Sequence, residues 1–328
     1  MRLTHFRVAM PLLAFSLLAS SAVFAKDTGY IFISSEEDDV VTVLDGKTFE
    51  KVKAIETAER PRHIQFSPDH SLLYVACGDG ESVDIIDVAK LEDVDRIKGI
   101  EDPEAFDLSP DGKTLYISLE DDSMLGTIDL AAQEMTQTVE VGGEPEGVLV
   151  TPDGKTAYVT SESANSVHVV DLASNTVQAS IVVGARPRRL VLTPDGKDLW
   201  VSSELDASAS IIDVATNTVK QKITFAPDGF RKEDITPVGM ALTKDAKTLY
   251  ITLGRANRVA VVDVASREVK DYILVGNRPW NVALTRDEAT LFVANGLSDD
   301  VSIVQTADNK VLKSMPAGRV PYMIAIDD

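Results

Sequence analysis

The sequence predicts an all-β fold, a seven-bladed β-propeller built from four-stranded blades. Three observations predict it, because a turn, a strand end and a proline each recur along the chain with almost constant spacing. Short units repeated at a fixed period are typical of folds in which each unit is one supersecondary element. A unit of about 40 residues with four short strands suits a propeller blade.

All three markers count the same number of units. The turn aspartates, spaced by 42, 42, 42, 50 and 42 residues, are Asp69, Asp111, Asp153, Asp195, Asp245 and Asp287. The strand-end positions are Asp45, Asp87, Asp129, Asp171, Asp213, Asp263 and Gln305. The recurring prolines are Pro61, Pro103, Pro145, Pro187, Pro237, Pro279 and Pro321. The markers therefore predict seven units with one insertion of 8 residues.

Each unit reads as four strands, which in the second unit are expected at 62–66, 72–76, 83–88 and 94–97. Alternating apolar and β-branched residues mark the strands, and Pro-Asp pairs mark the turns. Residues 30–33 match a second strand, whereas residues 322–326 match a first strand. We therefore expect the C-terminal strand to complete the blade begun by the N-terminal strands. This pairing closes the ring and protects its edges.

The first 25 residues resemble a signal peptide. Arg2 and Arg7 supply positive charge, residues 8–18 form a short apolar run, and small residues precede an expected cleavage after Ala25. The apolar run is short for a membrane span, and an uncleaved anchor is the alternative. The pattern predicts residues 1–25 as a signal peptide and residues 26–328 as a single periplasmic domain without a membrane span.

Composition narrows the classes of partner and cofactor. Lysine and arginine total 32 against 52 aspartates and glutamates, so the formal net charge is −20, and removing two arginines with the signal peptide lowers it to −22. This charge argues against nucleic acid and anionic membranes. Cys77 is the only cysteine, which excludes an intramolecular disulfide and a Cys-x-x-Cys-His haem attachment. His63, His70 and His168 lack metal-ligand spacing, so no metal site is expected.

Candidate site residues flank the recurring proline, which sits at the entry to each innermost strand. In the expected ring these positions gather at one mouth of the central channel, and they are Arg60 and Arg62, Asp102 and Glu104, Glu144 and Glu146, Arg186 and Arg188, Thr236 and Val238, Arg278 and Trp280, and Val320 and Tyr322. Arg189 and His63 follow one step further in. Variation at a fixed position of a repeat indicates a function placed on the scaffold.

Two interpretations of the mouth stay open. Charges of neighbouring blades can pair at an exposed rim, where each pair contributes roughly 0–1 kcal/mol. Arg278 differs, because its neighbouring blades offer no acid at the matched positions. Together with Trp280 and Tyr322, it suits a small, planar, anionic ligand. The insertion supplies Phe230, Arg231 and Lys232 as candidate lid residues or is a tolerated surface loop.

Several short motifs carry a family resemblance. These are the Ser/Thr-Pro-Asp-Gly turn, the Leu-Tyr-Val strand, strand ends of the Val-Ile-Asp type, and Val-Gly-x-x-Pro at residues 183–187. The repeat resembles the YVTN family of β-propellers and looks most like periplasmic propellers associated with pyrroloquinoline quinone-dependent catabolism of alcohols. Such motifs specify fold better than function.

The resemblance implies a periplasmic binding or accessory protein rather than an enzyme. It would handle pyrroloquinoline quinone as a ligand or dock a periplasmic dehydrogenase or transporter component. The expected ligand-binding residues are Arg60, Arg62, His63, Glu104, Glu146, Arg186, Arg188, Arg278, Trp280 and Tyr322.

Two further hypotheses remain. A lactonase-like hydrolase would draw on His63, Glu104, Glu146 and the mouth arginines, with a carboxylate as base and an arginine stabilising the oxyanion. A cell-envelope structural or interaction protein would use the propeller only as a surface.

Overall fold

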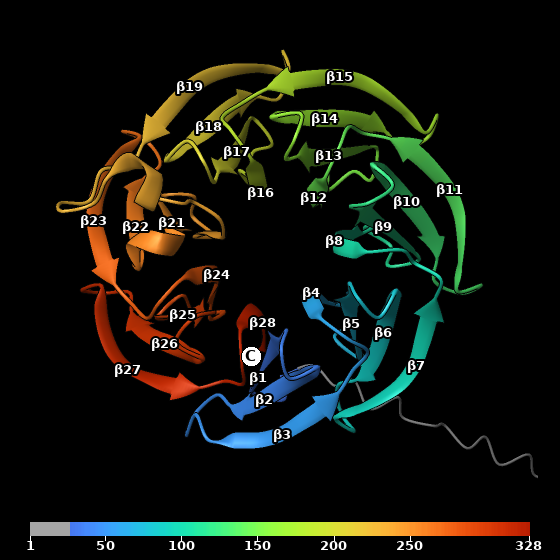
Figure 1. Cartoon of the computed structure of the whole chain (residues 1–328), viewed down its shortest axis with the longest axis horizontal. Helices are drawn as coiled ribbons and strands as arrows, with labels where there is room; N and C mark the ends of the chain where they lie inside the picture. Colours follow the sequence, from blue (N-terminus) through green and yellow to red (C-terminus); the bar gives the residue numbers. More distant parts are fainter. Residues whose placement is uncertain (1–26) are drawn as a thin grey trace, which may run out of the picture.

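The computed structural model describes residues 27–328, so the predicted signal peptide lies outside the described residues. Seven four-stranded antiparallel sheets surround one central axis, each sheet forming a blade (Figure 1). The predicted fold, a seven-bladed β-propeller, is confirmed. Between residues 27 and 328, no helix has the length and apolar character that crossing a membrane requires.

The strands form four concentric layers. The innermost are β28 (Pro321–Asp327), β4 (Pro61–Phe66), β8 (Pro103–Leu108), β12 (Pro145–Val150), β16 (Pro187–Leu192), β20 (Met240–Leu242) and β24 (Pro279–Leu284). The second are β1 (Tyr30–Ser35), β5 (Leu72–Cys77), β9 (Thr114–Leu119), β13 (Thr156–Ser161), β17 (Asp198–Ser203), β21 (Thr248–Thr252) and β25 (Thr290–Asn295). The third are β2 (Val40–Asp45), β6 (Ser82–Asp87), β10 (Met124–Asp129), β14 (Ser166–Asp171), β18 (Ser208–Asp213), β22 (Arg258–Asp263) and β26 (Asp300–Gln305). The outermost are β3 (Lys51–Glu56), β7 (Glu92–Lys98), β11 (Glu134–Glu140), β15 (Thr176–Val182), β19 (Thr218–Thr224), β23 (Glu268–Leu274) and β27 (Lys310–Pro316).

The repeated Pro-Asp-Gly turn is a hairpin connection. In the third blade the Asp111 carboxylate accepts hydrogen bonds from the Ser109 hydroxyl (2.7 Å) and the Lys113 amide (3.2 Å). Gly112 has a φ of +67°, a conformation that costs glycine little. The turn aspartates therefore act locally on the backbone, as their sequence context predicts.

The C-terminal strand closes the ring. β28 pairs with β1, so that Ile324 lies opposite Ile33 and Asp327 opposite Tyr30. The Asp327 carboxylate accepts hydrogen bonds from the amide and hydroxyl of Thr28 (2.8 and 2.6 Å) and contacts His70 Nδ1 at 2.8 Å. His70 belongs to the second blade, so the Asp327 carboxylate links the closing strand both to Thr28 and to the neighbouring blade. The closure predicted from the sequence is confirmed.

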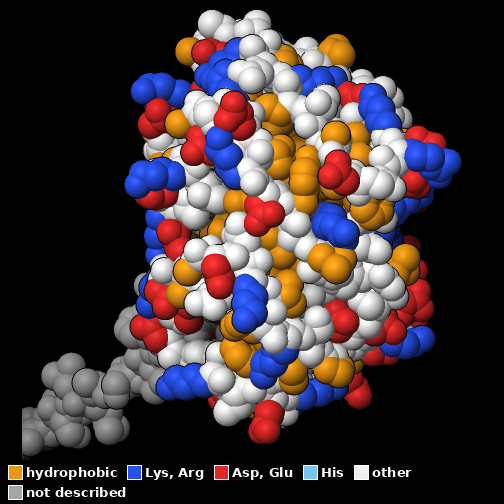
Figure 2. All heavy atoms as spheres, turned by 90° about the vertical axis from the view of Figure 1, so that its left-hand side faces the viewer, with side chains coloured by type: hydrophobic (Ala, Val, Ile, Leu, Met, Phe, Trp, Pro, Cys, Tyr) orange, Lys and Arg blue, Asp and Glu red, His pale blue; other side chains and the backbone are white. Residues whose placement is uncertain are grey.

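The hydrophobic core lies between successive blades. Between the first two, Phe32 and Ile64 pack with Leu73 and Cys77. Cys77 is fully buried, and burial raises the pKa of its thiol well above the usual value, which fits the packing role expected for it. On the outer wall formed by β19, β23 and β27, acidic, basic and apolar side chains are intermixed (Figure 2).

The insertion lies between β19 and β20. Phe225 is buried in the core of the neighbouring blades, and a 3-10 turn, η1 (Lys232–Asp234), contacts a second one, η2 (Gly254–Ala256). The innermost strand of this blade, β20, has only three residues, because the chain joins it after the insertion and Pro237. The insertion is thus packed against the fifth and sixth blades at the mouth face of the ring.

Candidate functional site

In five of the seven blades the preceding blade holds the backbone of the mouth residue that follows the recurring proline. A hydroxyl near the end of a second-layer strand donates to the carbonyl of the mouth residue that follows the recurring proline. These bonds join Ser34 to Arg62 (2.6 Å), Ser118 to Glu146 (2.7 Å), Thr160 to Arg188 (2.9 Å), Ser202 to Val238 (2.6 Å) and Thr252 to Trp280 (2.9 Å). The mouth is therefore a rigid arrangement carried by strands rather than by free loops.

The residue before the proline also has a fixed geometry. In most blades it adopts the left-handed region, with φ of 57° at Arg60, 55° at Arg186 and 57° at Arg278. That conformation is uncommon for residues other than glycine. Its amide is held by an aspartate or asparagine 21 residues earlier, in the bonds Arg60 to Asp39, Arg186 to Asn165, Arg278 to Asn257 and Val320 to Asp299.

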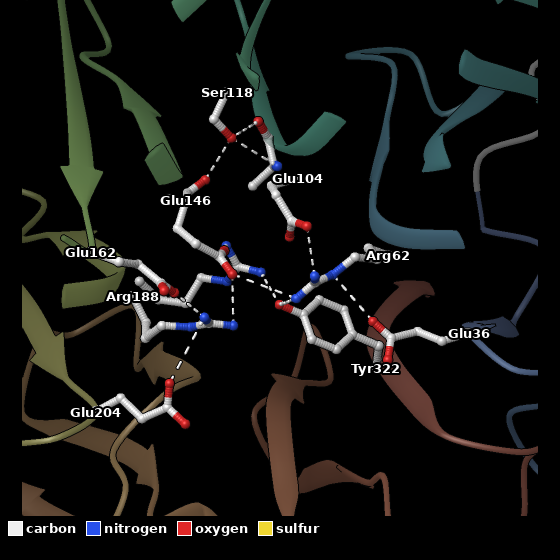
Figure 3. Close-up of polar contacts among 12 residues, drawn as sticks. Glu36, Arg62, Glu104, Ser118, Glu146, Glu162, Arg188, Glu204 and Tyr322 are labelled. Atoms are coloured by element: carbon white, nitrogen blue, oxygen red, sulfur yellow. Dashed lines mark hydrogen bonds and ion pairs between the residues drawn. The ribbon is translucent and has the colours of Figure 1, made fainter. Parts of the chain in front are cut away.

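The centre of the mouth is filled by a buried polar network (Figure 3). The Glu146 carboxylate contacts Arg188 Nη2 at 2.6 Å, Arg189 Nη1 at 2.8 Å and Arg62 Nη2 at 3.5 Å. The Tyr322 hydroxyl accepts hydrogen bonds from Arg62 Nη2 (2.9 Å) and Arg189 Nη2 (2.6 Å). Tyr322 is fully buried and Glu146 is 1% exposed. These side chains close the channel just below the mouth.

The expectation of weak ion pairs at an exposed rim is wrong for this central set. Arg62, Glu104, Glu146 and Arg188 are buried, because long side chains from facing blades converge on the axis. Burial alone would raise the pKa of Glu146, but the three arginines outweigh it and lower that pKa to about 2. Removing one partner of such a buried pair is costly, because the other charge stays buried.

Sequence reasoning missed a second ring of acids. Glu36, Glu120, Glu162 and Glu204 each come directly after a second-layer strand, and their spacings of 84, 42 and 42 residues, all multiples of the repeat, are a signal that would have revealed them. Glu36 pairs with Arg62 at 3.1 Å. Glu162 pairs with Arg188 and, at 2.5 Å, with Arg186.

This second ring corrects the view of Arg278. Its guanidinium pairs with Glu204 at 2.9 Å, although no acid occupies the matched positions beside neighbouring prolines. The guanidinium carbon also lies 4.4 Å from the centre of the Trp280 ring. Trp280 occupies space above Gly296, where an added Cβ would lie 2.4 Å from the indole Nε1. Arg278 and Trp280 are both half-buried and line one side of the mouth.

Arg60 lies at the mouth two blades away from Arg278, with the closing blade between them. Its guanidinium contacts Asp102 at 3.0 Å and Glu104 at 2.9 Å, so the predicted pairing with the adjoining acidic blade is confirmed. The Arg60 side chain remains 30% exposed. It fits above Gly78, where an added Cβ would lie 2.7 Å from Arg60 Nη1. The Arg60 guanidinium thus binds two carboxylates while the Arg60 side chain stays partly exposed to solvent.

Three carboxyl groups meet beside Arg60. Oxygen atoms of Asp102, Glu104 and Glu120 lie within 4.8 Å of one another. Burial, followed by a hydrogen bond with Glu104, raises the pKa of Glu120 to about 8. Carboxylates are ligands for hard cations. Here the Arg60 guanidinium already supplies positive charge to two of them, so the structure assigns no metal to this group.

His63 is separate from the polar network. Its ring packs edge-on against Phe106, with the ring centres 4.7 Å apart. Burial and the charge of Arg189 lower the pKa of His63 to about 3, so the imidazole is neutral at physiological pH. Within residues 27–328, its Nδ1 has no hydrogen-bond partner. His63 thus packs beneath the mouth.

The candidate lid residues lie on the mouth face but do not join the network. Phe230 packs on the core of its own blades, with the Arg258 guanidinium 5.4 Å from its ring centre. Lys232 pairs with Asp206 at 2.9 Å, and Arg231 pairs with Asp234 at 3.0 Å. In the described chain, none of the three candidate residues hydrogen-bonds to a mouth residue. Their role as a lid stays a prediction.

Known proteins place this chain among the β-propellers. A family model described as "Lactonase, 7-bladed beta-propeller" matches residues 174–317, and one described as "YNCE-like beta-propeller" matches residues 6–121. No curated protein matches the chain significantly. The resemblance to β-propeller families is therefore confirmed, whereas an association with quinone-dependent catabolism is not shown.

Solved structures with similar folds have different functions. Hydrazine synthase from Kuenenia stuttgartiensis is 25% identical, with a TM-score of 0.76 over 86% of this chain and 93% of that chain. The periplasmic gluconolactonase PpgL from Pseudomonas aeruginosa is 19% identical, with a TM-score of 0.74 over 90% and 98%. The dihydro-heme d1 dehydrogenase NirN is 16% identical, with a TM-score of 0.70 over 91% and 75%. Likeness at 16–19% identity shows the fold alone.

The expected accessory role in quinone-dependent alcohol oxidation is wrong. The lactonase family model that matches residues 174–317 favours the lactonase-like hypothesis instead. Whether pyrroloquinoline quinone or a periplasmic protein binds the mouth stays a prediction, as do the site residues themselves.

Proposed function

We propose that this protein hydrolyses lactones at the mouth of its propeller. The observation that carries the proposal is the half-exposed guanidinium of Arg60 resting on the carboxylates of Asp102 and Glu104. Ester hydrolysis needs a base to activate water and a positive group for the oxyanion. The mouth combines both kinds of group, and the matched lactonase family model supports this choice of chemistry.

Two kinds of mouth side chain carry out the proposed reaction, a carboxylate and a partly exposed arginine. Water attacks the lactone carbonyl carbon, a mouth carboxylate accepts the water proton, and a half-exposed arginine stabilises the negative oxygen. Arg60 and Arg186 are the arginines whose side chains remain most exposed at the mouth, at 30% and 42%. Collapse of the tetrahedral intermediate breaks the ring C–O bond, and the alkoxide takes the proton back.

Glu146 is unsuitable as the base, because three arginines surround it and lower its pKa to about 2. A carboxylate with so low a proton affinity is a weak acceptor. In the proposed function Glu146 therefore holds Arg62, Arg188 and Arg189 in place. The buried network forms the floor of the site, and the reacting carboxylate lies above it.

The side of the mouth formed by Arg278 and Trp280 suits the rest of the substrate. Trp280 offers a flat face, and Arg278 stands 4.4 Å from its ring centre. A sugar-derived lactone with a carboxylate or another anionic group would place its ring on the indole and its charge on the guanidinium. We propose the periplasm as the location, supported by the signal-like N-terminus and by the periplasmic gluconolactonase of similar fold.

The test is a panel of lactones assayed by continuous titration of the acid that ring opening releases. The wild type is expected to hydrolyse at least one aldonolactone with saturation. Arg60→Lys, which keeps the charge but not the fork, is expected to lower kcat/KM by roughly tenfold or more. Lys113→Ala, at an exposed turn remote from the mouth, is the control. Rates equal to spontaneous hydrolysis across the panel would refute the proposal.

A further inference from the structure

We infer that Glu120 is the catalytic residue that accepts and returns the proton, working as a carboxyl pair with Glu104. This inference rests on the proposed function, since it names the base of that site. Glu120 follows β9 at the mouth and was not among the residues that the proline pattern indicated. We assign this role to Glu120 from the contacts of the neighbouring Glu104.

Glu104 has one occupied and one free oxygen. Oε1 contacts Arg60 Nη2 at 2.9 Å and Arg62 Nη1 at 2.6 Å. Oε2 is buried and, within residues 27–328, has no hydrogen-bond partner, and a carboxylate oxygen of Glu120 lies within 4.8 Å of an oxygen of Glu104. The Glu104 side chain is fully buried. A buried oxygen without a partner is unfavourable, so a proton on Glu120 that bonds to Oε2 is favoured.

Glu120 is the exception among the acids close to the mouth floor. Glu36, Glu162 and Glu204 each pair with an arginine, whereas Glu120 makes no ion pair in the described part of the chain. The charged groups around it are Arg60, Arg62, Asp102, Glu104, Glu144, Glu146 and Glu162. Burial, together with the Glu104 and Glu146 carboxyl groups, raises the pKa of Glu120 to about 8. Two close carboxyl groups that share one proton are a known acid–base device.

Glu120 takes up one proton and returns it within each reaction cycle. Ionised Glu120 takes one proton from water as the new C–O bond forms to the lactone carbonyl carbon. The ring C–O bond then breaks, and the proton on Glu120 passes to the alkoxide that leaves. Glu104, held in place by Arg60 and Arg62, accepts the hydrogen bond that the protonated form of Glu120 donates. The products are a hydroxy acid and the unchanged carboxyl pair.

Two measurements test the assignment. The first is the dependence of kcat/KM on pH, expected to rise to half its maximum near pH 8 in the wild type. Glu120→Gln should lower kcat/KM about 100-fold or more and remove this rise, while Glu120→Asp should recover part of it. Asp122→Asn, an exposed acid in the same loop, should leave both unchanged. Full activity of Glu120→Gln would overturn the assignment.

The second measurement needs no substrate. Infrared difference spectra between the wild type and Glu120→Gln at pH 7 should contain the C=O stretch of one protonated carboxyl group, and the Asp122→Asn difference should not. Absence of that band overturns the carboxyl pair even if lactones are hydrolysed. A band without any lactone hydrolysis keeps the pair but overturns both its catalytic role and the proposed function.

Discussion

The Tyr322 hydroxyl accepts a hydrogen bond from Arg62 Nη2 at 2.9 Å, although the two residues are 260 positions apart. Tyr322 lies on β28, the strand that closes the ring, and Arg62 lies on β4 of the neighbouring blade. The strand that closes the ring therefore also supplies a residue of the polar network at the mouth. A change that opens the closing blade should also disorder the polar floor.

Tyr322→Phe is expected to lower the free energy of unfolding by about 1–3 kcal/mol, because it removes the hydroxyl that accepts hydrogen bonds from the buried Nη2 groups of Arg62 and Arg189. Urea titration of purified protein measures this loss. Tyr158→Phe is the control, since Tyr158 is buried in a hydrophobic cluster away from the network. Equal losses in the two variants would contradict the proposed importance of the hydroxyl.

Glu146→Gln is expected to destabilise the protein by about 3–5 kcal/mol, because three buried arginines lose their shared carboxylate. The matched control is Glu144→Gln, two residues earlier in the same blade and exposed. That control should stay within about 0.5 kcal/mol of the wild type. A stable Glu146→Gln variant would mean that the arginines are adequately solvated without Glu146.

Removing residues 319–328 should unfold or aggregate the protein, because β1 would lose its partner and expose an edge. Asp327→Asn is the milder version, since the amide keeps the shape but weakens bonds to Thr28 and His70. Size-exclusion chromatography and the melting temperature report both. A truncated protein with the melting temperature of the full chain would be inconsistent with ring closure by β28.

The blade number, the closure and the gathering of proline neighbours were predictable, because the markers at Pro61 and its equivalents fix the register of each innermost strand. Burial of the central residues was not predictable, since it depends on long side chains from opposite blades meeting on the axis. Glu120 was missed because it lies at a different repeat position, 16 residues after Glu104. Its importance appears only when both positions are placed in space.

The stability of the protein should depend on the protonation of Glu120. Burial raises its folded-state pKa from 4.5 to about 8, so the folded state binds the proton more tightly than the unfolded state. This contribution is fully present below pH 4.5 and is lost as the pH rises to 8. Urea titrations across this range should show a shallower decline for Glu120→Gln than for the wild type. Identical slopes would contradict the raised pKa.

Gly296→Ala should displace the Trp280 ring, because the new Cβ would lie 2.4 Å from its Nε1. The other tryptophan, Trp200, is fully buried, so a change in emission that also alters quenching by iodide reports on Trp280. Weaker binding of an aldonic acid is expected in the same variant. Unchanged emission and unchanged affinity would show that the indole is not part of the ligand site.

The most direct test of the central claim is the initial rate of acid release when the purified protein is mixed with aldonolactones at pH 8. The account predicts a saturable rate above spontaneous hydrolysis, lost in Glu120→Gln and retained in Asp122→Asn. Acid release that no lactone accelerates, or that Glu120→Gln leaves intact, would contradict hydrolysis by the mouth carboxyl pair.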